Sequence, residues 1–131
     1  MDVTQEERNW GIGIQLSWIL SFWLPGFGFV FPLVFWLVKR GDSRFLDAQG
    51  CEAVNFHLSL FLYGLGLSLC IVLFSIVTLG MGILIILPFL IVVPIIGFLI
   101  ALVCSIRAAI VANEGDIYAY PLSMRLITPA Y

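Results

Sequence analysis

The chain carries few charges, and its middle carries none. Asp, Glu, Lys and Arg make up 11% of the 131 residues, and no charged residue or histidine occurs from Leu58 to Ile106. As helix, at about 1.5 Å per residue, this stretch reaches roughly 70 Å, more than twice the ~30 Å hydrocarbon core of a bilayer. We therefore expect two antiparallel membrane helices that fold back at Gly80, within the turn signal 78–82.

Other absences exclude further classes of protein. The net charge is −2 and no basic block occurs, which argues against a nucleic-acid partner. The start of the chain has no basic region of a secretory signal, so we expect the first apolar segment to stay in the mature protein. Cys51, Cys70 and Cys104 are far apart and form no CxxC pair. We expect no disulfide framework, no metal site and no cofactor.

Catalytic motifs are also missing. The sequence has no Ser-His-Asp order, metal-binding HExxH, P-loop or Rossmann glycine pattern. Its single histidine, His57, has no nearby cysteine pair and no acidic residue in the apolar stretch that follows it. We predict that the protein is not an enzyme and has no catalytic residues.

The residues that are present favour a membrane fold. The chain is 62% hydrophobic, more than a soluble domain of this length can hide from water. We predict a single all-α integral membrane domain of four helices in two hairpins, followed by an extended interfacial tail at 117–127. The expected helices cover residues 5–24, 29–40, 45–78 and 83–113.

The first hairpin is predicted to be short or partly re-entrant. Thr4 and Glu7 match a capping box at its start, and the turn at Pro25–Gly28 divides it. The segment 29–40 gives only about 15–18 Å of helix, too little to cross a bilayer alone. Either the turn stays within the membrane and packs against the central hairpin, or the second helix tilts little and the bilayer thins. In the fourth helix Pro88 and Pro94 predict a bend, and beyond it Gly115 predicts a left-handed cap.

Small residues recur at every fourth position in two helices. In lipid such a ridge lets a second helix approach closely, so we predict that both ridges face protein. They consist of Gly13, Ser17 and Ser21 in the first helix and Gly97, Ala101 and Ser105 in the fourth.

A polar clamp is predicted near the open end of the central hairpin. Glu52, Asn55 and Ser59 share one helix face because they lie three and four residues apart. A hairpin centred at Gly80 places Arg107 level with Glu52 and Asn55. We predict that Arg107 binds both and joins the two helices; the alternative is a polar functional site at the cytoplasmic mouth.

Several segments of the sequence form a recognisable set: Gln5–Trp10, Pro32–Arg40, Asp47, Glu52–Phe56, Ala112–Gly115 and Tyr120–Ile127. Together they resemble a bacterial family of small membrane proteins catalogued as a domain of unknown function, DUF-4870, and also called Tic-20-like after a subunit of a chloroplast import translocon. Gln15, His57 and Val111 depart from the family pattern. The resemblance implies the bacterial cytoplasmic (inner) membrane. All six basic residues fall on one side of two hairpins, so both termini are expected in the cytoplasm.

Three functions remain in competition. We predict a non-enzymatic accessory, scaffold or interaction subunit, in contact with lipid and with a membrane-protein partner or further copies of itself. The alternative that the resemblance implies is a Tic-20-like component of a protein- or solute-conducting pathway, although the spans offer few polar residues to line a pore. An intramembrane enzyme is the third, and it lacks a nucleophile–base pair.

Overall fold

The computed structural model describes residues 2–23 and 27–129, and in these ranges the chain is helical without strands. This confirms the all-helical class. Four α-helices and one 3-10 helix follow one another along the chain. They are α1 (Gln5–Leu16), η1 (Ser17–Trp23), α2 (Val30–Lys39), α3 (Arg44–Val77) and α4 (Gly82–Glu114).

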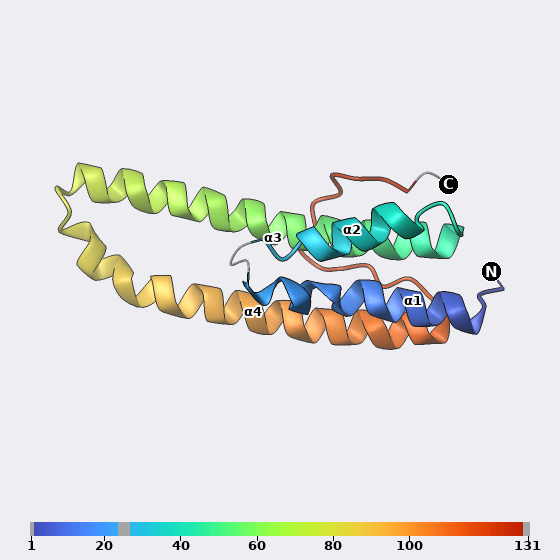
Figure 1. The fold of residues 1–131 in the computed structure, drawn as a ribbon. Coiled ribbons are helices and arrows are strands. Elements are labelled where there is room, and N and C mark those ends of the chain that lie inside the picture. Colours follow the sequence, from blue (N-terminus) through green and yellow to red (C-terminus); the bar gives the residue numbers. More distant parts are fainter. Residues whose placement is uncertain (1, 24–26, 130–131) are drawn as a thin grey trace.

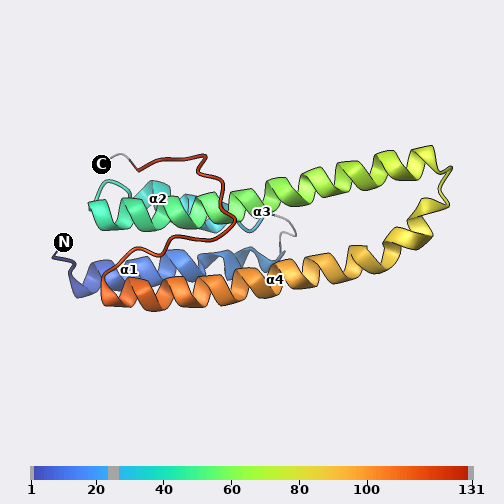
Figure 2. The same ribbon diagram turned by 180° about the vertical axis from the view of Figure 1, so that it is seen from behind.

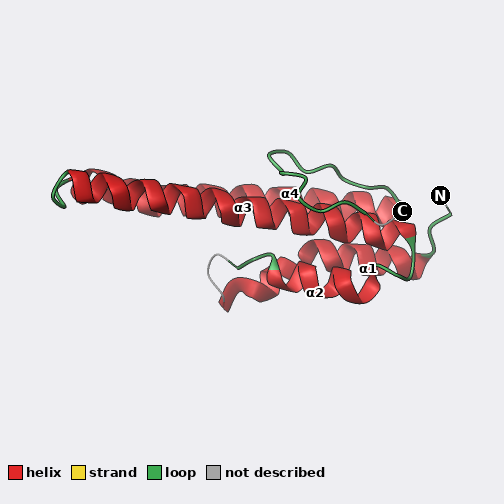
Figure 3. Cartoon of the chain, turned by 90° about the horizontal axis from the view of Figure 1, so that it is seen from above, coloured by secondary structure: helices red, strands yellow, loops and turns green. Residues whose placement is uncertain are grey.

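The two longest helices, α3 and α4, form an extended hairpin, and the other elements lie against the half of it that is far from its tip (Figure 1). Figure 2 shows the C-terminal tail leaving α4, passing between the α3 and α4 sides of the molecule and then running over α3. Seen from above, α1 and α2 lie on one side of the hairpin and most of the tail lies on the other (Figure 3).

Local signals set the helix ends. The predicted capping box is confirmed: the amide of Glu7 donates to Thr4 Oγ1 at 3.2 Å, and the amide of Thr4 donates to the Glu7 carboxylate at 2.8 Å. The hairpin tip has positive φ angles at Leu79 (53°) and Gly80 (85°), where the turn was expected. Gly115 ends α4 in the left-handed conformation (φ 88°), also as expected.

The first helix differs from the single helix expected over 5–24, because the α-helix ends at Leu16 and continues as 3-10 helix. The carbonyl of Ile14 accepts both the backbone N–H and the hydroxyl of Ser17, the latter at 2.7 Å. A serine side chain that bonds a carbonyl three residues back competes with the α-helical ladder. Residues 24–26 lie outside the described ranges, so the depth of the Pro25–Gly28 turn stays a prediction.

Burial is concentrated at the end of the hairpin that α1, α2 and the tail cover. Phe45 and Phe56 on α3 and Ala108 and Ala112 on α4 are almost fully buried there. Toward the tip the same two helices expose most of their apolar side chains, for example Val77 at 81% and Leu84 at 75%. Both helices are long and apolar enough to cross a membrane, by length and composition. Figure 1 shows α4 bending near the tip, in the part of the helix that precedes its packed half.

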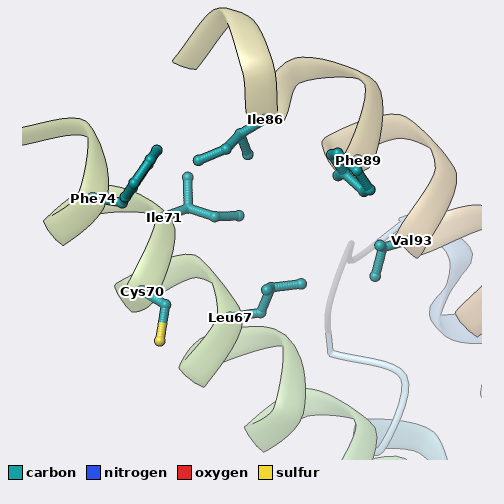
Figure 4. Close-up of a pocket in the computed structure, with 7 residues that line it drawn as sticks. All are labelled: Leu67, Cys70, Ile71, Phe74, Ile86, Phe89 and Val93. Carbon is teal, nitrogen blue, oxygen red and sulfur yellow. The ribbon is translucent and has the colours of Figure 1, made fainter. Parts of the chain in front are cut away.

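An apolar cleft of about 330 Å³ separates the two arms near the tip (Figure 4). Ile71 of α3 and Ile86 of α4 point toward one another across it. The arms therefore do not close on each other by direct side-chain packing along this part of the hairpin. The lining residues are Leu67, Cys70, Ile71, Phe74, Ile86, Phe89 and Val93.

Candidate functional site: a polar stripe that binds the C-terminal tail

The largest concentration of polar contacts joins α3 to the tail, residues 116–129. Glu52, Asn55, Ser59 and Tyr63 follow one another at spacings of three, four and four residues, which places them on one face of the helix. All four contact the tail. We call them the tail-binding stripe.

Asn55 makes the most regular of these contacts. Its side-chain amide donates to the carbonyl of Ile127 at 2.7 Å, and its side-chain oxygen accepts the amide of Ile127 at 2.8 Å. The side-chain amide of Asn55 thus makes the same pair of hydrogen bonds to Ile127 that a residue of an adjacent β-strand would make. Asn55 is 2% exposed, so water does not compete for either bond. The thiol of Cys51, one turn earlier, donates to the same Ile127 carbonyl at 3.1 Å.

Ser59 and Tyr63 extend the stripe along the tail. The hydroxyl of Ser59 accepts the amide of Met124 at 2.7 Å, and the hydroxyl of Tyr63 donates to the carbonyl of Leu122 at 2.6 Å. Leu122 has φ 59°, in the left-handed region. Because these bonds reach the backbone, the stripe recognises the path of the tail more than the identity of its side chains.

A second group of buried side chains joins α1, α3 and the tail. Gln15 donates to the side-chain oxygen of Gln49 at 2.6 Å, and Gln49 donates to the carbonyl of Asp116 at 2.6 Å. The hydroxyl of Tyr120 donates to Gln15, and its ring stacks on Phe56 with 4.3 Å between centroids. Burial raises the pKa of Tyr120, so the phenol remains a neutral donor.

The structure corrects the predicted clamp. Glu52 forms its ion pair with Arg125 of the tail, at 3.0 Å, and Asn55 bonds Ile127. Within the described residues, no hydrogen bond or ion pair joins Arg107 to either of them. The reason is rotation about the α4 axis, because Arg107 is exposed and lies off the face that packs inward. That face consists of Ala101, Cys104, Ser105, Ala108, Ala109 and Ala112.

Only part of each small-residue ridge is buried. Ser17 and Ser21 are buried, and so are Ala101 and Ser105. Gly13 and Gly97 instead face open space, with nothing within 4 Å of where a Cβ would stand. The part that these ridges play in helix packing stays a prediction, which substitution tests below.

Sequence reasoning missed the contact that positions α2. Trp36 donates from Nε1 to Asp47 at 2.8 Å and lies against Gly50, where an added Cβ would come 2.6 Å from the Trp36 Cβ. A glycine in the middle of a helix signals such a close approach, but it does not name the partner. The partners that join Gln15, Gln49, Asp116 and Tyr120 were also missed, because the bonded pairs lie 34, 67 and 105 residues apart in the chain.

His57 is held in one tautomer. Its Nδ1 lies 2.9 Å from the carbonyl of Ala53, and a carbonyl only accepts, so the proton sits on Nδ1 and Nε2 is the acceptor. Nε2 is buried without a hydrogen-bond partner in the part of the chain that the structure describes. The Trp18 ring lies beside it, at 5.3 Å between centroids. No group of three or more His, Cys, Asp or Glu in the described ranges is arranged to hold a metal ion.

Comparison with known proteins decides the family. Residues 6–127 match the model of the MamF/MmsF family, described as the magnetosome magnetite crystal formation protein family. The chain belongs to this family. The Tic-20-like, DUF-4870 assignment made from the sequence motifs is therefore wrong, and the conducting role that it implied loses its support. No curated protein and no solved structure matches the chain.

The match covers both partners of the tail contact. The MamF/MmsF region ends at residue 127, the residue that Asn55 binds, and so includes the stripe and the segment it holds.

Proposed function

We propose that this MamF/MmsF protein is a small, non-enzymatic membrane subunit that takes part in magnetosome crystal formation by organising other membrane components. The observation that carries the proposal is the half of the α3–α4 hairpin nearer the tip, where most apolar side chains are exposed. From Gly80 back to about residue 60 and forward to about residue 100, each arm is roughly 30 Å long, the thickness of the hydrocarbon core. Apolar side chains along both arms are exposed to the surroundings, and lipid or membrane partners would cover them.

The distribution of charge supports an indirect action on the crystal. The tip of the hairpin consists of Thr78, Leu79, Gly80, Met81 and Gly82, without an ionisable group. Iron in a mineral favours carboxylate and other oxygen ligands, and the acidic residues all lie at the opposite end of the molecule. With the basic residues and both termini in the cytoplasm, the protein offers no carboxylate to the far side of the membrane. Its effect would then pass through partners or through the bilayer.

The first hairpin would enter the near leaflet without crossing it. The rings of Trp18 in η1 and Phe98 in α4 lie 5.6 Å apart between centroids. The 3-10 helix η1 is therefore level with Phe98, which lies about 27 Å along α4 from the tip. Ile19, Leu20 and Phe27, around the end of this hairpin, are each about half exposed. Apolar side chains at this level support the re-entrant arrangement and favour it over a second crossing.

Deletion of the gene in its magnetosome-forming host, followed by complementation, tests the function. We expect magnetite crystals of altered number, size or shape in the deletion strain by electron microscopy, and recovery with the full chain. Crystals indistinguishable from the parent strain would overturn a role in their formation.

Topology is tested by cysteine labelling of Asp2→Cys and Leu79→Cys, with the three native cysteines replaced by alanine. We expect a membrane-impermeant reagent to reach the two positions from opposite faces of the membrane. Labelling of both from the same face would refute the proposed placement of the hairpin.

A further inference from the structure

The molecule is much wider at one end of the hairpin than at the other. Of the described elements, only α3 and α4 reach the tip, and α1, η1, α2 and the tail lie against the opposite half (Figure 1). Figure 3 shows α1 and α2 on one side of the hairpin and most of the tail on the other. We call α1, η1 and α2 the helical wing. The hairpin thus carries an addition on each side, and both additions are at the same end.

The helical wing reaches the hydrocarbon boundary of the cytoplasmic leaflet. The ring of Phe29, just before α2, lies 5.3 Å between centroids from that of Phe61 in α3. Phe61 is 19 residues before Gly80, about 28 Å along α3 from the tip. The 3-10 helix η1 lies at nearly the same distance, beside Phe98. With the tip at the far edge of a hydrocarbon core ~30 Å thick, both segments lie in the outer part of the near leaflet.

The tail reaches this level on the opposite side. The hydroxyl of Tyr63 donates to the carbonyl of Leu122 at 2.6 Å, and Tyr63 is 17 residues before Gly80, about 26 Å from the tip. The side chain of Leu122 is 65% exposed, and Ile19 and Leu20 on the helical wing are each about half exposed. Apolar side chains are therefore available to the acyl region on both sides of the hairpin.

The two leaflets consequently hold unequal amounts of protein. An α-helix with its side chains is about 10 Å wide, so it occupies roughly 80 Å² in cross-section. Of the described elements, the far leaflet holds two helices, whereas the boundary of the cytoplasmic leaflet holds the same two, two helical segments of the first hairpin and the tail. The excess is roughly 160 Å² before the tail is counted. Apolar segments that insert at the boundary of one leaflet make binding sensitive to membrane curvature.

We propose that this protein accumulates in membrane that is convex on its cytoplasmic face. On a convex face the headgroups are spread apart, so the helical wing and the tail enter between them more easily than on a flat one. The opposite leaflet is compressed, and there the protein inserts only α3 and α4. The partner is thus a lipid surface of defined curvature. This inference rests on the membrane placement proposed above.

Lipid nanotubes pulled from giant phosphatidylcholine vesicles test the preference. The full chain carries Asp2→Cys, with the three native cysteines replaced by alanine. A membrane-impermeant dye added outside labels only the copies whose wide end faces outwards. Because the outer face of a tube is convex, we expect these copies to be enriched in the tube relative to a lipid dye. The enrichment should be about twofold or more, which corresponds to ~0.4 kcal/mol, and it should rise as the tube narrows.

Leu79→Cys in the same background is the matched control for orientation. External dye then selects the copies whose wide end lies in the concave inner leaflet, and these should be depleted from the tube. Equal ratios for the two labels, or a ratio that does not change with tube radius, would overturn the curvature preference. Protein that sodium carbonate extracts from the vesicles would instead refute the membrane placement itself.

A pair of variants assigns the preference to the two additions. Leu20→Ser together with Leu122→Ser, in the Asp2→Cys chain, removes an apolar side chain from each side of the hairpin and should lower the enrichment. Ile110→Ser should keep it, because Ile110 is as exposed as Leu20, at 56%, but lies 30 residues beyond Gly80, about 45 Å from the tip and outside the hydrocarbon. A double variant with native enrichment and native unfolding temperature would overturn the role of the helical wing and the tail.

Discussion

Removal of the Asn55 side-chain amide is the most direct test of the tail-binding stripe. Asn55→Ala deletes two hydrogen bonds to Ile127, of 2.7 and 2.8 Å, at a position that is 2% exposed. A buried hydrogen bond contributes about 0.5–1.5 kcal/mol net, so the substitution should weaken attachment of the tail by roughly 1–3 kcal/mol. The helix itself should remain, because alanine is the best helix former.

Limited trypsin digestion in mild detergent measures this attachment. Arg125 lies in the held segment, two residues before Ile127, and cleavage after it requires the tail to leave α3. Where the cleavage rate follows the fraction of molecules whose tail has left α3, weakening the attachment of the tail by roughly 1–3 kcal/mol raises the cleavage rate about 5- to 150-fold. The released fragment, residues 126–131, is followed by mass spectrometry.

Asn9→Ala is the matched control, because Asn9 is exposed on α1 and bonds only Gln5 in the described part of the chain. It should leave the cleavage rate at Arg125 near that of the native chain. If Asn55→Ala is also cleaved at the native rate, the two bonds to Ile127 do not hold the tail, and the stripe loses its assigned role.

Four further predictions concern other contacts. Gly50→Ala should lower the free energy of unfolding by about 1–3 kcal/mol, because its Cβ overlaps Trp36, whereas Gly64→Ala, which meets open space, should not; thermal unfolding in detergent compares them. Glu52→Gln and Arg125→Gln should each cost less than about 1 kcal/mol, since the side chain of Arg125 is 67% exposed, and a double-mutant cycle should show coupling that the Glu52–Arg107 pair lacks. Ala101→Leu should destabilise and Gly13→Leu should not, because only Ala101 is buried; equal unfolding temperatures would refute this packing role. Hydrogen bonds from Ser43 and Thr4 lower the pKa of Glu7 from 4.5, so its contribution to stability should be present at neutral pH and be lost as the pH falls through the lowered pKa; Glu7→Gln should remove that part of the pH dependence.

The helices could be predicted because their signals are local. Apolar runs, the Thr4 capping box, the turn at Gly80 and the left-handed Gly115 each depend on a few neighbouring residues. The change to 3-10 helix at Ser17 was missed because it depends on a side chain competing for one carbonyl. The energy difference between the Ser17 side-chain bond and a continued α-helical ladder is small, so the packing of neighbouring elements decides which of the two forms.

The candidate site was only half predictable. Spacing alone placed Glu52, Asn55 and Ser59 on one face, and the structure uses that face. Their partners were predicted wrongly. The prediction of the Arg107 clamp compared how far each residue lies along its helix, and it ignored the direction in which Arg107 points around the axis of α4. The spacing of Ala101, Cys104, Ser105, Ala108 and Ala112 was the signal available to correct it, since a small-residue face of this kind leaves Arg107 on another side.

Tyr120 brings a residue of the tail into the core between the two arms of the hairpin. Its ring lies in the buried cluster that also contains Phe56 of α3 and Cys104 and Ala108 of α4. A tail residue thus occupies the space where the two helices would otherwise meet, and the hydrogen bonds of the stripe keep it there. The apolar cleft between Ile71 and Ile86 lies further along the same two helices, toward the tip. The tail therefore does more than close the polar end of the molecule: its Tyr120 ring is part of the buried core that joins α3 to α4.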